Sequence, residues 1–302
     1  MKLNLFMPAI GIATLILASC AEFSKNKDAN ISHRDGKRID SSSDGARSVV
    51  RLEMKDENGQ FKTVCSGILV DPRVVLTAAH CLVSVDEETG IVGDLIRPDS
   101  IQIRLSNGFI TKGTRSDYPR NFALAINHVD GLDIGYLVLG VPASSDLVAK
   151  VSTFNEFDNW TNSFASRGQS IGFGKTANSS LTAGNLNSLD LPYVGFYGPP
   201  KDVNTFDIRP ASRQDKLARP LEFMAGFGVE NTCSGDSGGG MFISIGNQMK
   251  LAGIASRTLA APNPEIDACA VGTLTSIYGF AEAALNWAKR LAPEAFSDEV
   301  NQ

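Results

Sequence analysis

Residues 231–240 read Asn-Thr-Cys-Ser-Gly-Asp-Ser-Gly-Gly-Gly, and the fold and chemistry of the chain can be argued outward from this stretch. Glycine suits tight turns and positive φ angles, so a segment this rich in glycine and serine predicts a turn and neither a helix nor a packed strand. Such a turn can direct successive backbone N–H groups at one point, an arrangement that stabilises an oxyanion. An ordinary surface turn has the same composition, so the rest of the chain must decide between the two interpretations.

The composition is that of a globular protein. Of the 302 residues, 43% are hydrophobic and 20% are charged, enough apolar material for one large core or two modest ones. A disordered chain or a coiled coil would have a different composition. The net charge of -5 argues against general nucleic-acid binding, which requires a basic surface.

The first twenty residues have the pattern of an export signal. Lys2 is followed by an apolar run over residues 5–17, too short for a membrane-spanning helix, and then by Leu-Ala-Ser-Cys ending at Cys20. This ending resembles the bacterial lipobox, whose cysteine becomes a lipidated first residue; ordinary signal cleavage is the alternative. We predict a signal peptide over residues 1–19, lipidation of Cys20, and a polar stalk or removable pro-segment over residues 20–47.

After the stalk, short apolar or alternating segments recur between turn signals, and each has the pattern of a β-strand. They cover residues 48–54, 64–70, 74–78, 101–105, 134–139, 170–173, 240–245 and 251–256. One convincing helical pattern covers residues 279–291, with Phe280, Ala283, Ala284, Trp287 and Leu291 on one face. Regularly spaced short strands indicate an all-β barrel or sandwich, and two barrels suit the length better than one.

His80 is the best candidate for a reacting histidine. It lies in a turn of small residues, Thr-Ala-Ala-His-Cys, directly after an apolar segment. Cys81 can be tied back to Cys65, and closing a loop of that size contributes ~3 kcal/mol and fixes the histidine backbone. Asp133 precedes a strongly apolar strand, where a buried carboxylate would need a donor such as His80. Asp130 is the competing acid.

Together, Thr77-Ala-Ala-His-Cys81, Asp133 with its apolar strand and Gly235-Asp-Ser-Gly-Gly239 resemble the chymotrypsin/trypsin family of serine peptidases, in which His, Asp and Ser follow the same order. The segments Ile-Gly-Phe-Gly-Lys-Thr from residue 171 and Leu-Ala-Gly-Ile-Ala-Ser from residue 251 are similar to further parts of that family. The resemblance covers about residues 48–291. It implies an all-β, trypsin-like fold of two six-stranded antiparallel β-barrels, about residues 48–160 and 161–278, with a C-terminal α-helix over residues 279–291 and a tail over residues 292–302.

The resemblance also implies a role for each candidate residue. Ser237 is the nucleophile, His80 the general base and acid, and Asp133 the group that orients the imidazole. The N–H groups of Gly235 and Ser237 hold the oxyanion. The implied disulfides are Cys65–Cys81 and Cys233–Cys269.

The chain departs from the family in its substrate pocket. Asn231 stands where trypsins carry the aspartate that selects Lys or Arg, and Thr258 stands where the family usually has glycine. We therefore predict an uncharged side chain of small or medium size before the cleaved bond, although Arg257 leaves open a preference for acidic groups nearby. The resemblance places the pocket at Asn231, Thr232, Ser256, Thr258 and Gly272.

The second departure concerns activation. Family zymogens are cut before an Ile-Val-Gly-Gly-like start, and the new amine pairs with the aspartate that precedes the nucleophile, here Asp236. The chain offers only Arg38-Ile39-Asp40. We predict cleavage after Arg38, which would release the domain from its lipid and give a partner to an Asp236 carboxylate that would be costly to bury alone.

The sequence therefore predicts an exported serine endopeptidase, attached to the bacterial cell envelope as a lipoprotein or secreted after release. Its partners are protein or peptide substrates and, through the lipid, a membrane. We expect a monomer that uses no cofactor or metal and binds no nucleic acid. The alternatives are a non-catalytic, trypsin-like binding or adhesion module on the cell surface and an esterase-like hydrolase that uses the same three residues.

Overall fold

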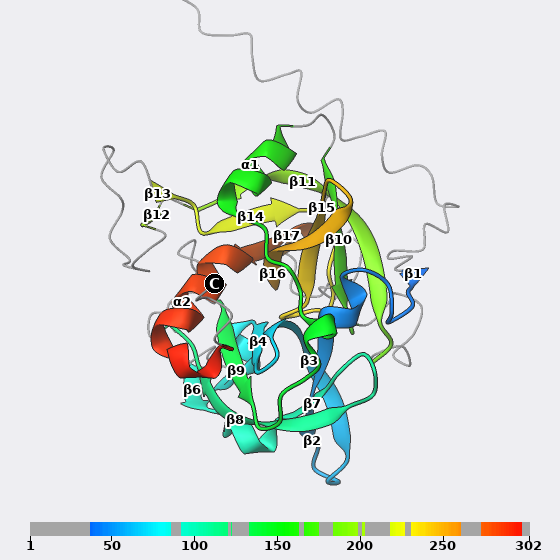
Figure 1. Ribbon diagram of the computed structural model, residues 1–302, viewed down its shortest axis with the longest axis vertical. Coiled ribbons are helices and arrows are strands. Elements are labelled where there is room, and N and C mark those ends of the chain that lie inside the picture. Colours follow the sequence, from blue (N-terminus) through cyan, green and yellow to red (C-terminus); the bar gives the residue numbers. More distant parts are fainter. Residues whose placement is uncertain are drawn as a thin grey trace, which may run out of the picture. The chain divides into compact units, whose positions relative to one another are not determined.

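The computed structural model describes residues 37–85, 92–119, 122, 133–162, 166–174, 184–198, 201–202, 218–226, 231–260 and 273–297 (Figure 1). Several predicted features lie outside these residues: the signal peptide, Cys20, Asp130, Cys269 and Gly272. In the described part of the chain, no helix has the length and apolar character needed to span a bilayer.

Six antiparallel strands close the first barrel in the order β2-β3-β4-β9-β8-β7. They are β2 (Val49–Lys55), β3 (Phe61–Asp71), β4 (Val74–Thr77), β7 (Gln102–Arg104), β8 (Ile110–Asp117) and β9 (Gly135–Leu139). Leu52 on β2 pairs with Ile103 on β7, which closes the ring, and both side chains belong to the buried core. A separate two-stranded ribbon joins β5 (Val83–Val85) to β6 (Val92–Leu95).

The second barrel has the strand order β11-β10-β15-β16-β17-β14 and closes through the pairing of β11 with β14. Its strands are β10 (Arg167–Gly172), β11 (Asn187–Tyr197), β14 (Glu222–Ala225), β15 (Gly240–Ile245), β16 (Gln248–Ala260) and β17 (Thr273–Phe280). The short strand β1 (Lys37–Arg38) adds to β11, and β12 (Lys201–Asp202) pairs with β13 (Ala218–Arg219). The predicted fold class of two six-stranded barrels is confirmed.

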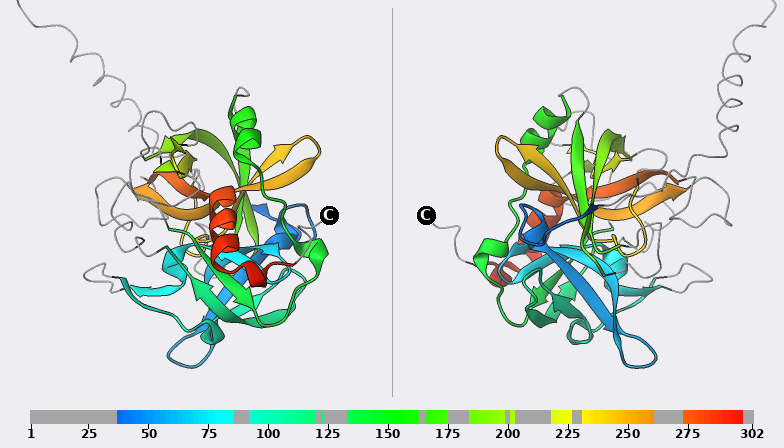
Figure 2. Two further views of the ribbon diagram at one scale, coloured as in Figure 1. Left: turned by 60° about the vertical axis from the view of Figure 1, so that its left-hand side comes forward. Right: turned by 90° about the vertical axis from the view of Figure 1, so that its right-hand side faces the viewer.

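Helix α2 (Ala281–Leu291) follows β17 and packs against strands of both barrels (Figure 2). The ring of Trp287 lies 5.5 Å from that of Tyr136 on β9, centroid to centroid, so the end of the chain is fastened to the first barrel. The predicted helix over residues 279–291 begins two residues too early, because Gly279 and Phe280 end β17. Leu291, predicted on the same face as Trp287, is 42% exposed. The helix ends there, and Ala292 and Ala295 of the following turn take the buried positions.

Helix α1 (Phe154–Thr161) was not predicted from the sequence. A capping box begins it, in which the Thr153 hydroxyl accepts the N–H of Glu156 and the Glu156 carboxylate accepts the N–H of Thr153. Phe157 then packs against Phe223 and Phe280, with ring centroids 4.8 and 4.9 Å away. A helix of about two turns is too short for its hydrophobic period to stand out, so Thr-Phe-Asn-Glu was the available signal.

Candidate active site

His80 is presented by a short 3₁₀ turn, Ala79–Cys81, that follows β4. Ala79 is fully buried, so the turn packs closely against its surroundings and needs small residues. A disulfide joins Cys65 on β3 to Cys81, with the Cα atoms 6.1 Å apart, and confirms the predicted pairing. This covalent tether restricts the backbone next to the imidazole.

Asp133 holds His80 at two points. Its Oδ1 accepts the backbone N–H of His80 at 3.0 Å, and its Oδ2 lies 2.8 Å from the ring Nδ1. The Ser256 hydroxyl donates to the same Oδ2 at 2.6 Å. Asp133 is only 5% exposed, and these contacts satisfy a carboxylate that would be costly to bury alone. The structure thus brings Asp133 to His80, whereas Asp130 lies outside the described residues.

Burial and charge act in opposite directions on this pair. Burial raises the pKa of Asp133, but the neighbouring His80 and the Ser256 hydroxyl outweigh it and lower this pKa to about 2. Burial lowers the pKa of His80, and the Asp133 carboxylate raises it above its ordinary value of 6.5. The carboxylate is therefore ionised at neutral pH, so Nδ1 carries the proton and Nε2 is the basic nitrogen.

The loop that carries the candidate nucleophile makes two consecutive tight turns. The N–H of Asp236 donates to the carbonyl of Cys233 at 2.9 Å, and the N–H of Gly239 donates to the carbonyl of Asp236 at 2.7 Å. The third residue of each turn is a glycine with a positive φ, 94° at Gly235 and 78° at Gly238. This is the signature of type II turns, which glycine adopts without strain. The backbone therefore requires these two glycines of the quoted stretch.

The loop of Ser237 packs directly against the turn of His80. The N–H of Ser66 on β3 donates to the carbonyl of Ser237 at 2.8 Å. A Cβ at Gly238 would lie 2.2 Å from the hydroxyl oxygen of Thr77, at the end of β4. Glycine alone permits so close an approach. The loop of Ser237 thus lies beside the turn that carries His80, at a contact between the two barrels.

Main-chain amides hold the carboxylate of Asp236. Its Oδ1 accepts the N–H of Gly174 and its Oδ2 accepts the N–H of Cys233, each at 2.8 Å. A Cβ at Gly174 would lie 2.3 Å from Oδ1, which explains the second glycine of Ile-Gly-Phe-Gly. Cys233 is disulfide-bonded, and its predicted partner, Cys269, lies outside the described residues.

Arg38 and Ile39, which flank the predicted activation cut, lie beside β11. Arg38 is exposed in β1 and pairs with Asn187. The N–H of Ile39 donates to the carbonyl of Leu186 at 3.3 Å, and its side chain packs against the hydrophobic core to which both barrels contribute. In the uncut chain, the amide of Ile39 and the carboxylate of Asp236 therefore have separate partners.

The described residues of the predicted substrate pocket are polar and uncharged. Asn231 and Thr232 are buried, and both contact the hydroxyl of Ser276. The backbone N of Thr232 lies 2.9 Å from this hydroxyl and Asn231 Oδ1 lies 3.3 Å from it. Thr258 on β16 pairs in register with Ser276 on β17, whereas Gly272 lies outside the described residues. Ser276 was not predicted from the sequence, because no local pattern marks it.

Arg257, a possible recognition group for acidic substrates, forms an ion pair within the chain, with Glu222. Its guanidinium donates to both carboxylate oxygens of Glu222, at 2.8 and 2.9 Å, and to the hydroxyl of Ser256 at 2.9 Å. Burial lowers the pKa of Arg257, and the Glu222 carboxylate more than offsets this effect. The charge of Arg257 is thus compensated, and Ser256 connects it to Asp133.

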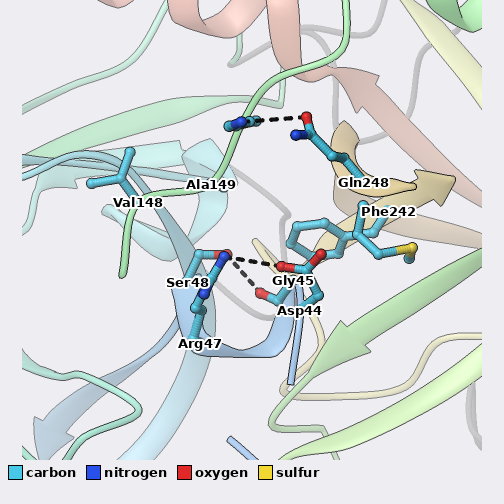
Figure 3. Close-up of a pocket in the computed structure, with 10 residues that line it drawn as sticks. Asp44, Gly45, Arg47, Ser48, Val148, Ala149, Phe242 and Gln248 are labelled. Carbon is cyan, nitrogen blue, oxygen red and sulfur yellow. Dashed lines mark hydrogen bonds and ion pairs between the residues drawn. The ribbon is translucent and has the colours of Figure 1, made fainter. Parts of the chain in front are cut away.

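A cavity of about 130 Å³ lies outside this group of residues (Figure 3). Its walls come from residues 44–48, residues 148–150 and the β15–β16 hairpin. Arg47 contacts Asp44 and Lys150 contacts Gln248 along its lining. The cavity shares no lining residue with the candidate site.

One group of potential metal ligands occurs in the described part of the chain, made of Cys65, His80 and Cys81. The two cysteines form the disulfide, so neither offers a thiolate to a metal ion.

Two six-stranded antiparallel barrels, with a histidine, an aspartate and a serine gathered where they meet, define the class of chymotrypsin-like serine peptidases. The family model for Trypsin matches residues 38–278. The chain therefore belongs to the trypsin family, and the resemblance seen in the sequence is confirmed. A comparison with curated proteins found no match.

Proposed function

We propose that the chain is an exported serine endopeptidase that hydrolyses peptide bonds through Ser237, His80 and Asp133. The observation that supports this most strongly is the 2.8 Å contact between the ring Nδ1 of His80 and the buried carboxylate of Asp133. It leaves Nε2 basic and fixes the ring in one orientation. The loop of Ser237 is bonded to the barrel that carries this histidine, through the N–H of Ser66.

Acylation begins when Nε2 of His80 removes the hydroxyl proton of Ser237 and Oγ attacks the scissile carbonyl. The tetrahedral intermediate carries its negative charge on the former carbonyl oxygen, which the N–H groups of Gly235 and Ser237 stabilise. The imidazolium returns the proton to the leaving amine, and an acyl ester remains on Ser237. Water activated by the same imidazole then hydrolyses the ester, while Asp133 stabilises the imidazolium in both halves of the reaction.

Labelling with a fluorophosphonate tests this chemistry. The wild-type chain should form an adduct that is absent from Ser237→Ala and kept in Ser234→Ala, which changes an exposed serine of the same loop. A processed chain without any Ser237-dependent adduct would instead indicate the non-catalytic binding module. An adduct accompanied by ester hydrolysis, with no cleavage of peptides, would favour the esterase.

For specificity, we propose an uncharged residue of small or medium size before the cleaved bond. The amide of Asn231 and the hydroxyl of Thr232 offer no charge to a substrate side chain, and Glu222 compensates the charge of Arg257. A peptide-library profile should therefore be dominated by small and medium uncharged residues. A dominant preference for Lys, Arg, Asp or Glu would contradict this assignment.

We also propose lipidation of Cys20 and later release by cleavage after Arg38, whose exposed side chain is accessible to a peptidase. A fatty-acid analogue fed to expressing cells should label the wild-type precursor and not Cys20→Ala. Mass spectrometry of active, released enzyme should find Ile39 at its N-terminus. Active material that begins at any other residue would exclude this cut as the activating step.

A further inference from the structure

Ser66 on β3 is fully buried, and its polar atoms contact the candidate active site. Its hydroxyl accepts the N–H of Phe173 at 2.9 Å and donates to the carbonyl of Gly235 at 2.8 Å. Its N–H donates to the carbonyl of Ser237 at 2.8 Å. Its carbonyl accepts the hydroxyl of Thr77, also at 2.8 Å. One side chain and its backbone thus connect three separate segments around the nucleophile.

The two carbonyls held by Ser66 come from the same residues as the two N–H groups proposed for the oxyanion hole. The carbonyl of Gly235 belongs to the peptide that lies between these two donors, so holding it restricts rotation of the backbone on both sides. Donors that are fixed in advance need no reorganisation when the negative charge develops. We propose that Ser66 is a positioning residue that fixes the oxyanion hole through the carbonyl of Gly235, a role that rests on the proposed peptidase function.

Phe173, the second residue bonded to the Ser66 hydroxyl, is held in place by further contacts. Arg51 stands opposite Ser66 in the β2–β3 register, and its guanidinium lies 5.5 Å from the centroid of the Phe173 ring. Arg51 also donates to the carbonyl of Gly184 at 3.0 Å, and the N–H of Gly184 donates to the carbonyl of Phe173 at 3.1 Å. The backbone of Phe173 is therefore held in place, and the Ser66 hydroxyl, bonded to both residues, holds the carbonyl of Gly235 at a set position relative to it.

Replacing Ser66 by alanine removes the hydroxyl that connects Phe173 to Gly235. The N–H of Phe173 and the carbonyl of Gly235 both lose a partner inside the protein. The peptide after Gly235 is the one that reorients, because glycine has the widest choice of backbone angles. We expect kcat to fall about tenfold, less than the roughly 10²–10³ lost with a whole donor, while KM changes by less than about twofold.

Steady-state kinetics of Ser66→Ala and Ser48→Ala test the proposal. Ser48 is a matched control, because it is 1% exposed, donates its hydroxyl to the carbonyl of Gly45 at 2.7 Å and lies outside the candidate site. Titration with a fluorophosphonate counts the folded enzyme, so partial unfolding does not enter kcat. A peptidyl trifluoromethyl ketone, which forms a tetrahedral oxyanion on the serine, should lose affinity for Ser66→Ala by the same factor as kcat and keep its affinity for Ser48→Ala.

Equal kcat and equal ketone affinity in the two variants would overturn the positioning role and leave the peptidase function standing. A loss confined to KM would also overturn it, because Ser66 would then act in ground-state binding. A wild-type chain that forms no Ser237-dependent adduct would overturn the proposed function, and the role of Ser66 with it.

Discussion

Replacing Gly235 by alanine perturbs the type II turn on which the proposed oxyanion hole depends. At a φ of 94°, an L-residue is strained by roughly 1–2 kcal/mol. The new Cβ would also lie 3.0 Å from the Cα of Gly174 and 3.3 Å from the carbonyl oxygen of Phe173. Gly174 cannot easily move away, because its N–H is bound to the carboxylate of Asp236. The turn itself must therefore change.

The strain is relieved when the peptide between Ser234 and Gly235 rotates and the turn becomes type I, which needs no positive φ. That rotation carries the N–H of Gly235 out of the oxyanion hole. Loss of one such donor lowers kcat by about 10²–10³. We expect Gly235→Ala to lose about a hundredfold in kcat/KM, with no greater loss of thermal stability than backbone strain alone produces.

Gly59→Ala supplies the control for backbone strain. Gly59 has a φ of 75° between β2 and β3, and a Cβ there would meet no atom within 4 Å. Peptide hydrolysis gives kcat/KM for both variants, and circular dichroism gives Tm, which moves by about 2–4 °C per kcal/mol in a domain of this size. The reasoning is refuted if Gly235→Ala keeps kcat/KM within about threefold of Gly59→Ala at a much lower Tm, because the turn would then have absorbed the strain.

Three further outcomes follow from the contacts around His80. The buried Asp133 carboxylate raises the pKa of His80 above 6.5, so kcat/KM should fall as the pH drops through a midpoint above 6.5. The same ion pair stabilises the folded protein fully below pH 6.5, and this stability is lost as the pH rises through the folded-state pKa of His80. Measurement of Tm against pH would detect this loss. Replacing Cys65 and Cys81 by serine should lower the free energy of unfolding in urea by ~3 kcal/mol and reduce kcat, and an unchanged stability would contradict the tether. Glu222→Gln removes the carboxylate that compensates the charge of Arg257. Because Arg257 lowers the pKa of His80, the midpoint of the kcat/KM pH profile should then move to lower pH. An unchanged midpoint would contradict this electrostatic coupling.

The strands that could be predicted bury mainly apolar residues, although β14 and β17 were missed as well and bury Phe223 and Tyr278. Strand β8 could not be predicted, because the positions it buries are Thr111, Gly113 and Ser116, which give no hydrophobic period. Strand β11 contains Pro192 and an irregular register next to Gly195, features that count against a strand. Strand β8 is needed to close the first barrel and strand β11 to close the second. Closure was therefore implied by the family resemblance and not by periodicity.

In the candidate site too, residues that lie in a local sequence pattern could be predicted and residues without one could not. His80 and Ser237 could be found because each lies in a local pattern of small residues, and Asp133 because an apolar strand follows it. Ser66 has no such pattern, since its hydroxyl acts on Gly235, which is 169 residues away. Glu222 is likewise 35 residues from Arg257. Contacts of this kind exist only after the barrels have closed and met, so no local pattern could have revealed them.

The stretch 231–240 does not hold its shape alone. The first barrel binds it through Ser66, which contacts the carbonyls of Gly235 and Ser237, and the second barrel binds it through the N–H of Gly174 at Asp236. The contacts that shape the proposed oxyanion hole are thus among those that join the barrels. Because His80 comes from one barrel and Ser237 from the other, separation of the barrels would remove the proposed general base and the proposed oxyanion hole in one step. For the proposed peptidase, a partly unfolded chain is therefore inactive toward neighbouring copies of itself, and activity appears only when both barrels are folded and in contact.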